Sequence, residues 1–188
     1  MHGHDVVIDN FEFRNANKFT NLNTAYNAAG VRIRSGSPTP NGGDITLRHC
    51  YIHDNGDGVL ADNVGPGWGE WFAKAPFILF EYDDFYKNGD EFGPSHNMYI
   101  GWGGNLTFTL RYSKSRDAYL GHNVKTRARY NNILYNQITD TIGNDELFVE
   151  FSNRGNHLRG RQSSLSSRGD ESGCQWRPDA LSGCGRCP

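Results

Sequence analysis

Apolar and polar residues alternate in several short runs of this sequence, and these runs resemble one another. The clearest are Val6–Phe13, Ile45–Ile52, Ile78–Phe85 and Phe108–Ser115, and a later run, Ile133–Ile138, fits the same frame. A period of two is typical of β-strands, because successive side chains point to opposite faces. Asn, Asp and Gly, which favour tight turns, follow the runs. We therefore predict a set of repeated strands joined by turns.

The alignment of these runs also predicts which residues lie side by side. Two inward columns emerge, the first made of Ile8, Leu47, Phe80 and Leu110 and the second of Phe13, Ile52 and Phe85. Asp83 is expected to face inward as well, beside Cys50 and Ser113, with Asn136 aligned to Ser113. Successive runs are offset by 39, 33, 30 and 23 residues, so the loops between the strands vary in length. Such spacing is typical of stacked repeats with insertions on one side.

A second strand follows each of the first ones. Its copies are Gly30–Arg34, Gly58–Asp62, Asn97–Gly101 and Asn123–Arg127. Alternation predicts that two columns point inward, namely Val31, Val59, Met98 and Val124, and Ile33, Ala61, Ile100 and Thr126. Two further columns are predicted to face outward, namely Arg32, Leu60, Tyr99 and Lys125, and Arg34, Asp62, Gly101 and Arg127. Neighbouring strands lie about 4.8 Å apart, so residues of one column are close in space.

These repeats predict an all-β fold, a right-handed parallel β-helix (solenoid) of about five coils within residues 1–150. Residues 151–188 form a Ser/Arg/Gly-rich tail of low hydrophobicity, and we expect this tail to be poorly structured. Such a tail, and a first strand without a capping element, indicate a fragment with an atypical, truncated or frame-shifted end. Alternation fades after Asn144, which places the boundary near residue 150.

Composition supports short strands and excludes several partners. The hydrophobic fraction is 36%, with 13% aromatic residues and 23 glycines, which suits strands joined by tight turns better than helices. The formal net charge is −2, so the sequence offers no electrostatic argument for binding nucleic acid or an anionic membrane. No apolar stretch is long enough to span a membrane, and no signal peptide is predicted in the given chain. The oligomeric state does not follow from the sequence.

A repeated phrase stands out, Ser95-His-Asn-Met-Tyr-Ile and Gly121-His-Asn-Val-Lys-Thr. Its offset of 26 residues places His96 beside His122 and Asn97 beside Asn123. The two asparagines predict a ladder of side-chain amides that bond one another. The two histidines are either structural turn residues or an acid, a base or metal ligands, since histidine titrates near neutral pH.

Three phrases resemble bacterial right-handed parallel β-helix repeat proteins of the pectate-lyase-like superfamily. They are Gly3-His-Asp-Val-Val-Ile-Asp-Asn-Phe-Glu-Phe, Asn88-Gly followed by the first His-Asn phrase, and Gly121-His-Asn-Val-Lys-Thr-Arg-Ala. The resemblance covers about Gly3 to Gly143. That superfamily includes polysaccharide lyases, glycoside hydrolases, epimerases and non-catalytic adhesins. It implies a carbohydrate-active protein with a polysaccharide or smaller sugar-like substrate and an extracellular or periplasmic location.

The candidate catalytic residues gather on the outward face of the second strands. They are Lys125, Arg127, His122, His96 and Tyr99, and Arg34 and Asp62 follow in the same stripe as candidate substrate-binding residues. A lyase that acts on a uronic acid needs positive charge to neutralise the carboxylate and a base to remove the proton beside it. Lys125 next to Arg127 offers both, because a neighbouring cation lowers the pKa of a lysine. The alternative is that both are solvated surface charges.

Aspartates and aromatic residues complete the candidate site. Asp57, Asp84 and Asp90 could hold Ca²⁺, which takes six to eight oxygen ligands, and the resemblance implies the same ion. The alternatives are turn formation or the two carboxylates of a glycosidase. Two insertions are predicted, at residues 64–77 and 101–105. Their three tryptophans either stack on sugar faces or cover the strands as a lid, namely Trp68, Trp71 and Trp102.

Three functions therefore stay open. The first is a lyase acting on an acidic polysaccharide, with the basic residues above in the catalytic roles. The second is a hydrolase of glycosides or small esters and lactones, in which His, Asp and a metal ion activate water. The third is a non-catalytic glycan-binding or adhesive protein, in which the aromatic loops carry the binding.

Overall fold

The computed structural model describes residues 5–16, 28–34, 44–62, 77–90, 95–141, 147–151, 157–161 and 164–167. These residues form β-strands: β1 (Val6–Asp9), β2 (Glu12–Arg14), β3 (Ala29–Arg34), β4 (Ile45–Arg48), β5 (Tyr51–His53), β6 (Asp57–Asp62), β7 (Phe77–Glu81), β8 (Asp84–Tyr86), β9 (Met98–Arg111), β10 (Lys114–Arg116), β11 (His122–Leu134), β12 (Gln137–Asp140), β13 (Leu147–Phe151), β14 (His157–Arg161) and β15 (Ser164–Ser167). Within the described part of the chain, no helix is long and apolar enough to cross a membrane.

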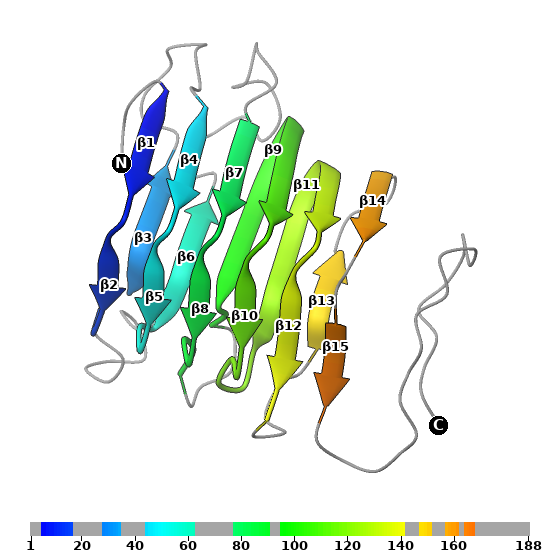
Figure 1. The fold of residues 1–188 in the computed structure, drawn as a ribbon. Helices are drawn as coiled ribbons and strands as arrows, with labels where there is room; N and C mark the ends of the chain where they lie inside the picture. The colour runs from blue at the N-terminus through cyan, green and yellow to red at the C-terminus, as the bar shows by residue number, and fades with distance from the viewer. Residues whose placement is uncertain are drawn as a thin grey trace.

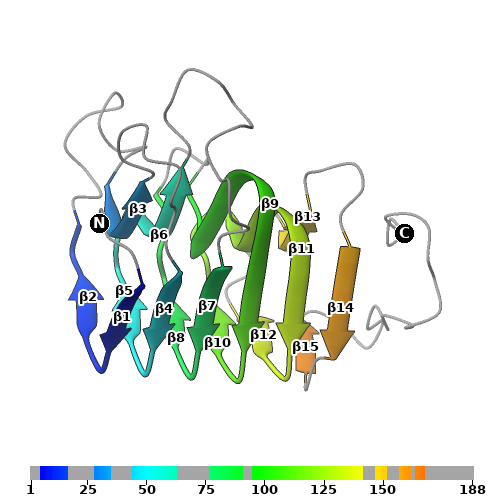
Figure 2. The same ribbon diagram turned by 90° about the horizontal axis from the view of Figure 1, so that it is seen from above.

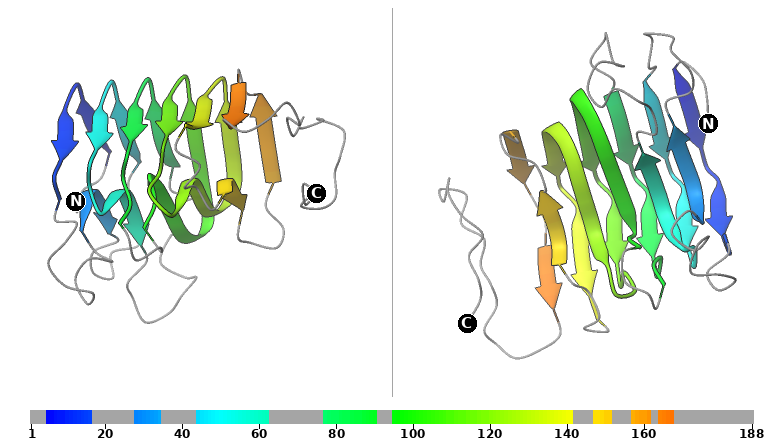
Figure 3. Two further views of the ribbon diagram at one scale, coloured as in Figure 1. Left: turned by 90° about the horizontal axis from the view of Figure 1, so that it is seen from below. Right: turned by 180° about the vertical axis from the view of Figure 1, so that it is seen from behind.

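The strands make two parallel sheets (Figure 1). The larger sheet has nine strands, in the order β1-β4-β7-β9-β11-β13, with β14 also paired to β11 and with β3 and β6 joined to β9. The smaller sheet has six strands, in the order β2-β5-β8-β10-β12-β15. The long strands β9 and β11 bend, so the larger sheet curls around (Figure 2). Views from below and from behind show its two arms on opposite sides of the interior (Figure 3).

The predicted architecture of about five coils of a right-handed β-helix is wrong. The described strands form two parallel sheets, and the larger one curls into a half-barrel. The sequence suggested a loop at residues 101–105, whereas the backbone of β9 continues through it and joins both arms in one sheet. Two register shifts in the pairing of β11 with β9, between Thr126 and Ala128 and between Ala128 and Tyr130, accommodate the bend. Alternation sets which face a side chain takes, but it does not show where a strand bends instead of ending.

The start of the predicted tail also differs from the expectation. Strand β14 pairs with β11, and β15 pairs with β12, so the expectation of a poorly structured tail does not hold for these two strands. Residues 168–188 lie outside the described part of the chain.

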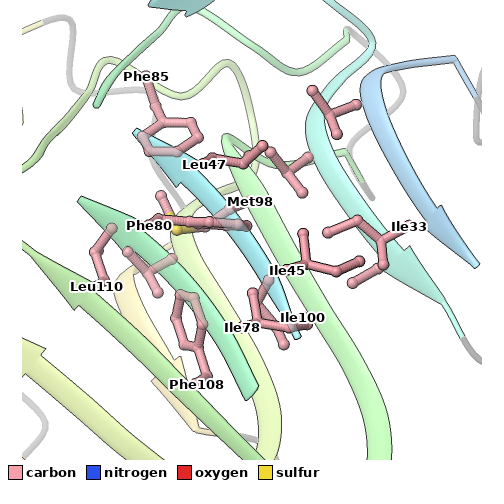
Figure 4. Packing of buried hydrophobic residues seen from close by; sticks show 14 of the residues in the cluster. Ile33, Ile45, Leu47, Ile78, Phe80, Phe85, Met98, Ile100, Phe108 and Leu110 are labelled. Atoms are coloured by element: carbon pink, nitrogen blue, oxygen red, sulfur yellow. The ribbon is translucent and has the colours of Figure 1, made fainter. Parts of the chain in front are cut away.

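The predicted strand register is confirmed. Ile8 pairs with Leu47, Leu47 with Phe80, and Phe80 with Leu110. The second inward column has the predicted partners as well, since Phe13 pairs with Ile52 and Ile52 with Phe85. The inward side chains build the core between the sheets (Figure 4). Large apolar residues that are fully buried there fix the register, because a slip by one residue would turn every one of them outward.

Sharp corners with a left-handed residue join β4 to β5, β7 to β8, β9 to β10 and β11 to β12. The corner residues His49, Tyr82, Tyr112 and Tyr135 have φ of 52°, 58°, 54° and 57°. Their rings stack in sequence, with centroids 5.2, 5.2 and 5.4 Å apart. The stacking explains why aromatic residues occupy a backbone conformation that usually favours glycine or asparagine.

Behind the corners at Tyr82, Tyr112 and Tyr135 a polar side chain faces inward, as the alignment predicted for Asp83. Its Oδ1 accepts the backbone N–H of Cys50 at 2.8 Å, and its backbone N–H donates to Ser113 Oγ at 3.1 Å. Asn136 holds the equivalent place beside Ser113, whose N–H it accepts at 2.9 Å. The column therefore satisfies backbone groups that the corners leave without strand partners.

The predicted asparagine ladder is confirmed and is longer than expected. Asn97 Nδ2 donates to Asn123 Oδ1 at 2.8 Å, Asn88 Nδ2 to Asn97 Oδ1 at 2.9 Å, and Asn55 Nδ2 to Asn88 Oδ1 at 2.9 Å. All four side chains are fully buried. The ladder lies where the smaller sheet passes into β6, β9 and β11, and it holds the start of the second strands in place.

Candidate functional site

The outward face of β6, β9, β11 and β13 carries the candidate site. Pairing places Leu60 beside Tyr99, Tyr99 beside Lys125, and Lys125 beside Glu150. The first three were predicted to share this column. Glu150 was not, because alternation fades after Asn144, although its offset of 25 residues from Lys125 nearly repeats the 26-residue offset of the His-Asn phrases.

Lys125 and Glu150 form an ion pair on this face. Lys125 Nζ lies 2.9 Å from Glu150 Oε2, with side chains that are 19% and 28% exposed. The pair is therefore neither free in solvent nor fully buried, and the attraction is stronger than between two solvated surface charges. Lys125 is thus held by a carboxylate, in contrast to the solvated surface charge considered as the alternative.

Arg127 and Tyr99 form the second contact of the face. The Arg127 guanidinium lies 5.6 Å from the centroid of the Tyr99 ring, a distance at which a cation is attracted to the ring electrons. Arg127 and Lys125 are two residues apart on β11 and point to the same side of the sheet. Together the three residues form a cationic and aromatic patch, called the basic patch below.

His96 and His122 touch each other, as predicted. Their predicted place on the outward face is wrong, because both side chains are buried beneath the basic patch. Their ring centroids are 4.8 Å apart in an edge-to-face arrangement, and their exposed fractions are 4% and 2%. His96 also approaches the Tyr99 ring, at 5.8 Å between centroids. Burial, with the nearby His122 and Lys125, lowers the pKa of His96 to about 3, so this ring is neutral at physiological pH.

The hydrogen bonds of the two rings continue to Glu150. His96 Nδ1 accepts the backbone N–H of His122 at 3.0 Å, and His122 Nδ1 lies 3.2 Å from the same atom. His122 Nε2 lies 2.8 Å from Glu150 Oε2, the oxygen that also receives Lys125. The buried histidines and the basic patch are therefore connected through one carboxylate.

Asp57 and Asp90 form a buried acidic pair beside His96. Asp57 Oδ1 accepts the backbone N–H of His96 at 2.8 Å, and Ser95 Oγ donates to Asp90 Oδ2 at 2.9 Å. Burial is the main cause that raises the pKa of Asp57 to about 7, and the Asp90 charge adds to it. Asp57 therefore retains its proton over much of the acidic to neutral range, as a general acid must.

The three aspartates proposed as Ca²⁺ ligands do not come together. Asp57 starts β6 in the larger sheet, whereas Asp84 lies on β8 in the smaller one and binds Arg116 through both oxygens at 3.1 and 2.9 Å. Among the described residues, no group of three His, Cys, Asp or Glu side chains is arranged to hold a metal ion. These residues do not fit a Ca²⁺ site. A Ca²⁺ requirement stays a prediction.

The remaining predicted residues are placed only in part. Arg34 and Asp62 are paired at the ends of β3 and β6, as the alignment predicted, and Trp102 lies within β9 instead of in a loop. The side chains of these three residues lie outside what the structure describes, as do Trp68 and Trp71 altogether. Their proposed contacts with a sugar stay predictions.

Comparison of the chain with protein-family models, with curated proteins and with solved structures finds no match. The chemistry of the site is therefore inferred from its own residues.

Proposed function

We propose that this chain is a carbohydrate-active enzyme, a lyase that acts on an acidic polysaccharide at the basic patch. The observation that supports this proposal is the arrangement of Lys125, Arg127 and Tyr99 on one outward face, with two cations beside an aromatic ring. A uronic acid residue has a carboxylate for the cations and an apolar sugar face for a ring. A neutral glycan has no carboxylate to offer these cations.

The reaction that suits this patch is β-elimination. Pairing of the carboxylate with Arg127 stabilises the negative charge that develops when the proton beside it is removed. The proton passes to the base, the C–H electrons form a carbon–carbon double bond, the bond to the glycosidic oxygen breaks, and that oxygen takes up a proton from water. The products are a sugar with an unsaturated end and a shortened chain.

Lys125 is the proposed base, and Glu150 is its proton partner. In the ion pair with Glu150 the lysine is an ammonium, so it has to lose a proton before it can accept one. Glu150 Oε2 lies within hydrogen-bond distance of Nζ and is therefore the group to which that proton can pass. Arg127, which stays charged, is the residue that keeps the substrate carboxylate in place.

Incubation with polyuronates tests this proposal by the absorbance of new unsaturated ends, with EDTA and then Ca²⁺ added in parallel samples. Lys125→Ala should abolish the absorbance rise. Lys114→Ala is the matched control, because Lys114 is exposed on β10 of the smaller sheet and its loss should leave activity unchanged. Equal activity of both variants, or no unsaturated product from any polyuronate, would refute the lyase.

A hydrolase is the second candidate, and the acidic pair favours it. Asp57 has a pKa of about 7 and accepts the backbone N–H of His96. It could therefore donate its proton to a leaving group that reached it. This function predicts glycoside or ester hydrolysis without unsaturated products, and a loss of activity in Asp57→Asn. Binding of a glycan without turnover would instead support the non-catalytic function.

A further inference from the structure

Glu150 connects two basic groups through a single oxygen. Its Oε2 lies 2.9 Å from Lys125 Nζ and 2.8 Å from His122 Nε2, and both partners belong to the neighbouring strand β11. Glu150 itself is on β13 and is paired with Lys125 in the sheet. Nothing in the alternation pattern identified this residue, so the tertiary structure adds it to the site.

His122 binds Glu150 through one ring nitrogen and contacts His96 through the other. Its Nε2 lies 2.8 Å from Glu150 Oε2, and because a carboxylate only accepts hydrogen bonds, this nitrogen is the donor. His122 Nδ1 lies 3.2 Å from His96 Nδ1, which already accepts the backbone N–H of His122. Glu150 thus accepts from both Lys125 and His122.

The two partners of Glu150 differ in their access to solvent. His122 is 2% exposed and lies under the sheet surface, whereas the side chains of Lys125 and Glu150 are 19% and 28% exposed. A ligand that arrives from solvent therefore reaches Lys125 and Glu150 before it reaches His122. On Lys125 the Glu150 carboxylate occupies the position that an acidic sugar would require.

We propose that Glu150 determines which ligands the basic patch accepts, because its carboxylate has to be replaced on Lys125 by a carboxylate of the ligand. This inference rests on the proposed function. A uronic acid can make the exchange with little electrostatic loss, since one anion replaces another. A neutral sugar cannot, because it would leave the Lys125 ammonium without a counter-ion. Glu150 remains bound to His122 during the exchange and so stays near the site.

Calorimetric titration of wild type, Glu150→Gln and Glu150→Asp with a uronic acid oligosaccharide tests the exchange, with a neutral oligosaccharide of equal length as control. Release of Lys125 in Glu150→Gln should tighten uronate binding about fivefold, which corresponds to a partly exposed ion pair of about 1 kcal/mol. Glu150→Asp keeps the charge but shortens the reach, so its affinity should lie between the other two. Equal or weaker binding by Glu150→Gln would overturn the proposal.

Acylation of Lys125 in the absence of ligand gives a second and independent measurement. Trace labelling with acetic anhydride should modify Lys125 several-fold faster in Glu150→Gln than in wild type, while Lys114 serves as the internal reference. If no variant binds the uronate, the lyase proposal fails, and the labelling still decides whether Glu150 holds Lys125. Unchanged labelling would refute that role. If Glu150→Gln does not fold, as judged by circular dichroism, Glu150→Asp should show a smaller rise in both measurements.

Discussion

Asp83→Asn should stabilise this protein, and the gain should grow with pH. Asp83 is 2% exposed, its Oδ1 accepts one backbone N–H, and its Oδ2 has no hydrogen-bond partner among the described residues. Burial is the main cause that raises the pKa of this carboxyl from 3.8 to about 7. The folded protein therefore favours the protonated form, in which no charge is buried.

The magnitude follows from this difference in pKa. Because the pKa of Asp83 is higher in the folded than in the unfolded chain, Asp83 does not lower the free energy of unfolding below about pH 4, where the carboxyl is protonated in both. Stability falls as the pH rises, because the unfolded chain releases the proton first, and the loss is complete above about pH 7. Three pKa units at about 1.4 kcal/mol each give a penalty of up to about 4 kcal/mol at pH 8. Asn avoids this penalty because it is neutral at every pH.

The geometry of Asn136 shows that an amide fits this column. Asn136 Nδ2 donates to the carbonyl of Leu110 at 2.8 Å, and the corresponding carbonyl near Asp83 is that of Leu47. An Asn at position 83 would therefore keep the bond to Cys50 and gain a donor for a buried carbonyl. We expect no steric penalty, since the two side chains have nearly the same shape.

Urea unfolding of wild type and Asp83→Asn, followed by circular dichroism near pH 4 and near pH 8, measures the effect. The variant should match wild type within about 1 kcal/mol at the lower pH and exceed it by about 2 to 4 kcal/mol at the higher. Asp5→Asn is the control, because Asp5 is exposed and should change neither value. An equal difference between Asp83→Asn and wild type at both pH values would show that the Asp83 charge is not the cause.

Three further predictions concern the ladder, the core and the histidines. Asn88→Ala should lower the free energy of unfolding by about 3 kcal/mol, because the buried amides on both sides lose their partner. Asn132→Ala removes one partly buried hydrogen bond and should lower it by only about 1 kcal/mol in the same urea assay. Phe80→Ala should cost about 3 to 5 kcal/mol in thermal unfolding, and a loss below about 1 kcal/mol would mean that the two sheets do not share this core. His96 should remain neutral in nitrogen NMR spectra from about pH 5 to pH 8, and titration near pH 6.5 would contradict its buried position.

Much of the site could be placed from the sequence alone, because aligning the repeated strands shows which residues lie side by side in space. Tyr99 and Lys125 were predicted to lie side by side, as were His96 and His122; strand pairing confirms the first pair and the ring contact confirms the second. Asn97 and Asn123 were predicted to bond for the same reason. Each of these pairs depends on residues that recur at a regular offset.

Other contacts had no such signal. Asn55 and Asn88 join the ladder from corners whose spacing varies, and Glu150 follows a segment in which alternation fades. The predicted Ca²⁺ ligands do not come together because Asp84 lies in the smaller sheet. Its position only six residues before Asp90 in the sequence gave no sign of this separation.

The sequence by itself determined the strands, their register and the side of the sheet on which each side chain lies, because the period of two is a local property of an extended chain. Only the tertiary structure decided that β9 and β11 bend and continue, so that the larger sheet curls instead of forming separate coils. It also decided which charges are buried and which carboxylate reaches Lys125, since burial and ion pairing depend on every element that packs around a group.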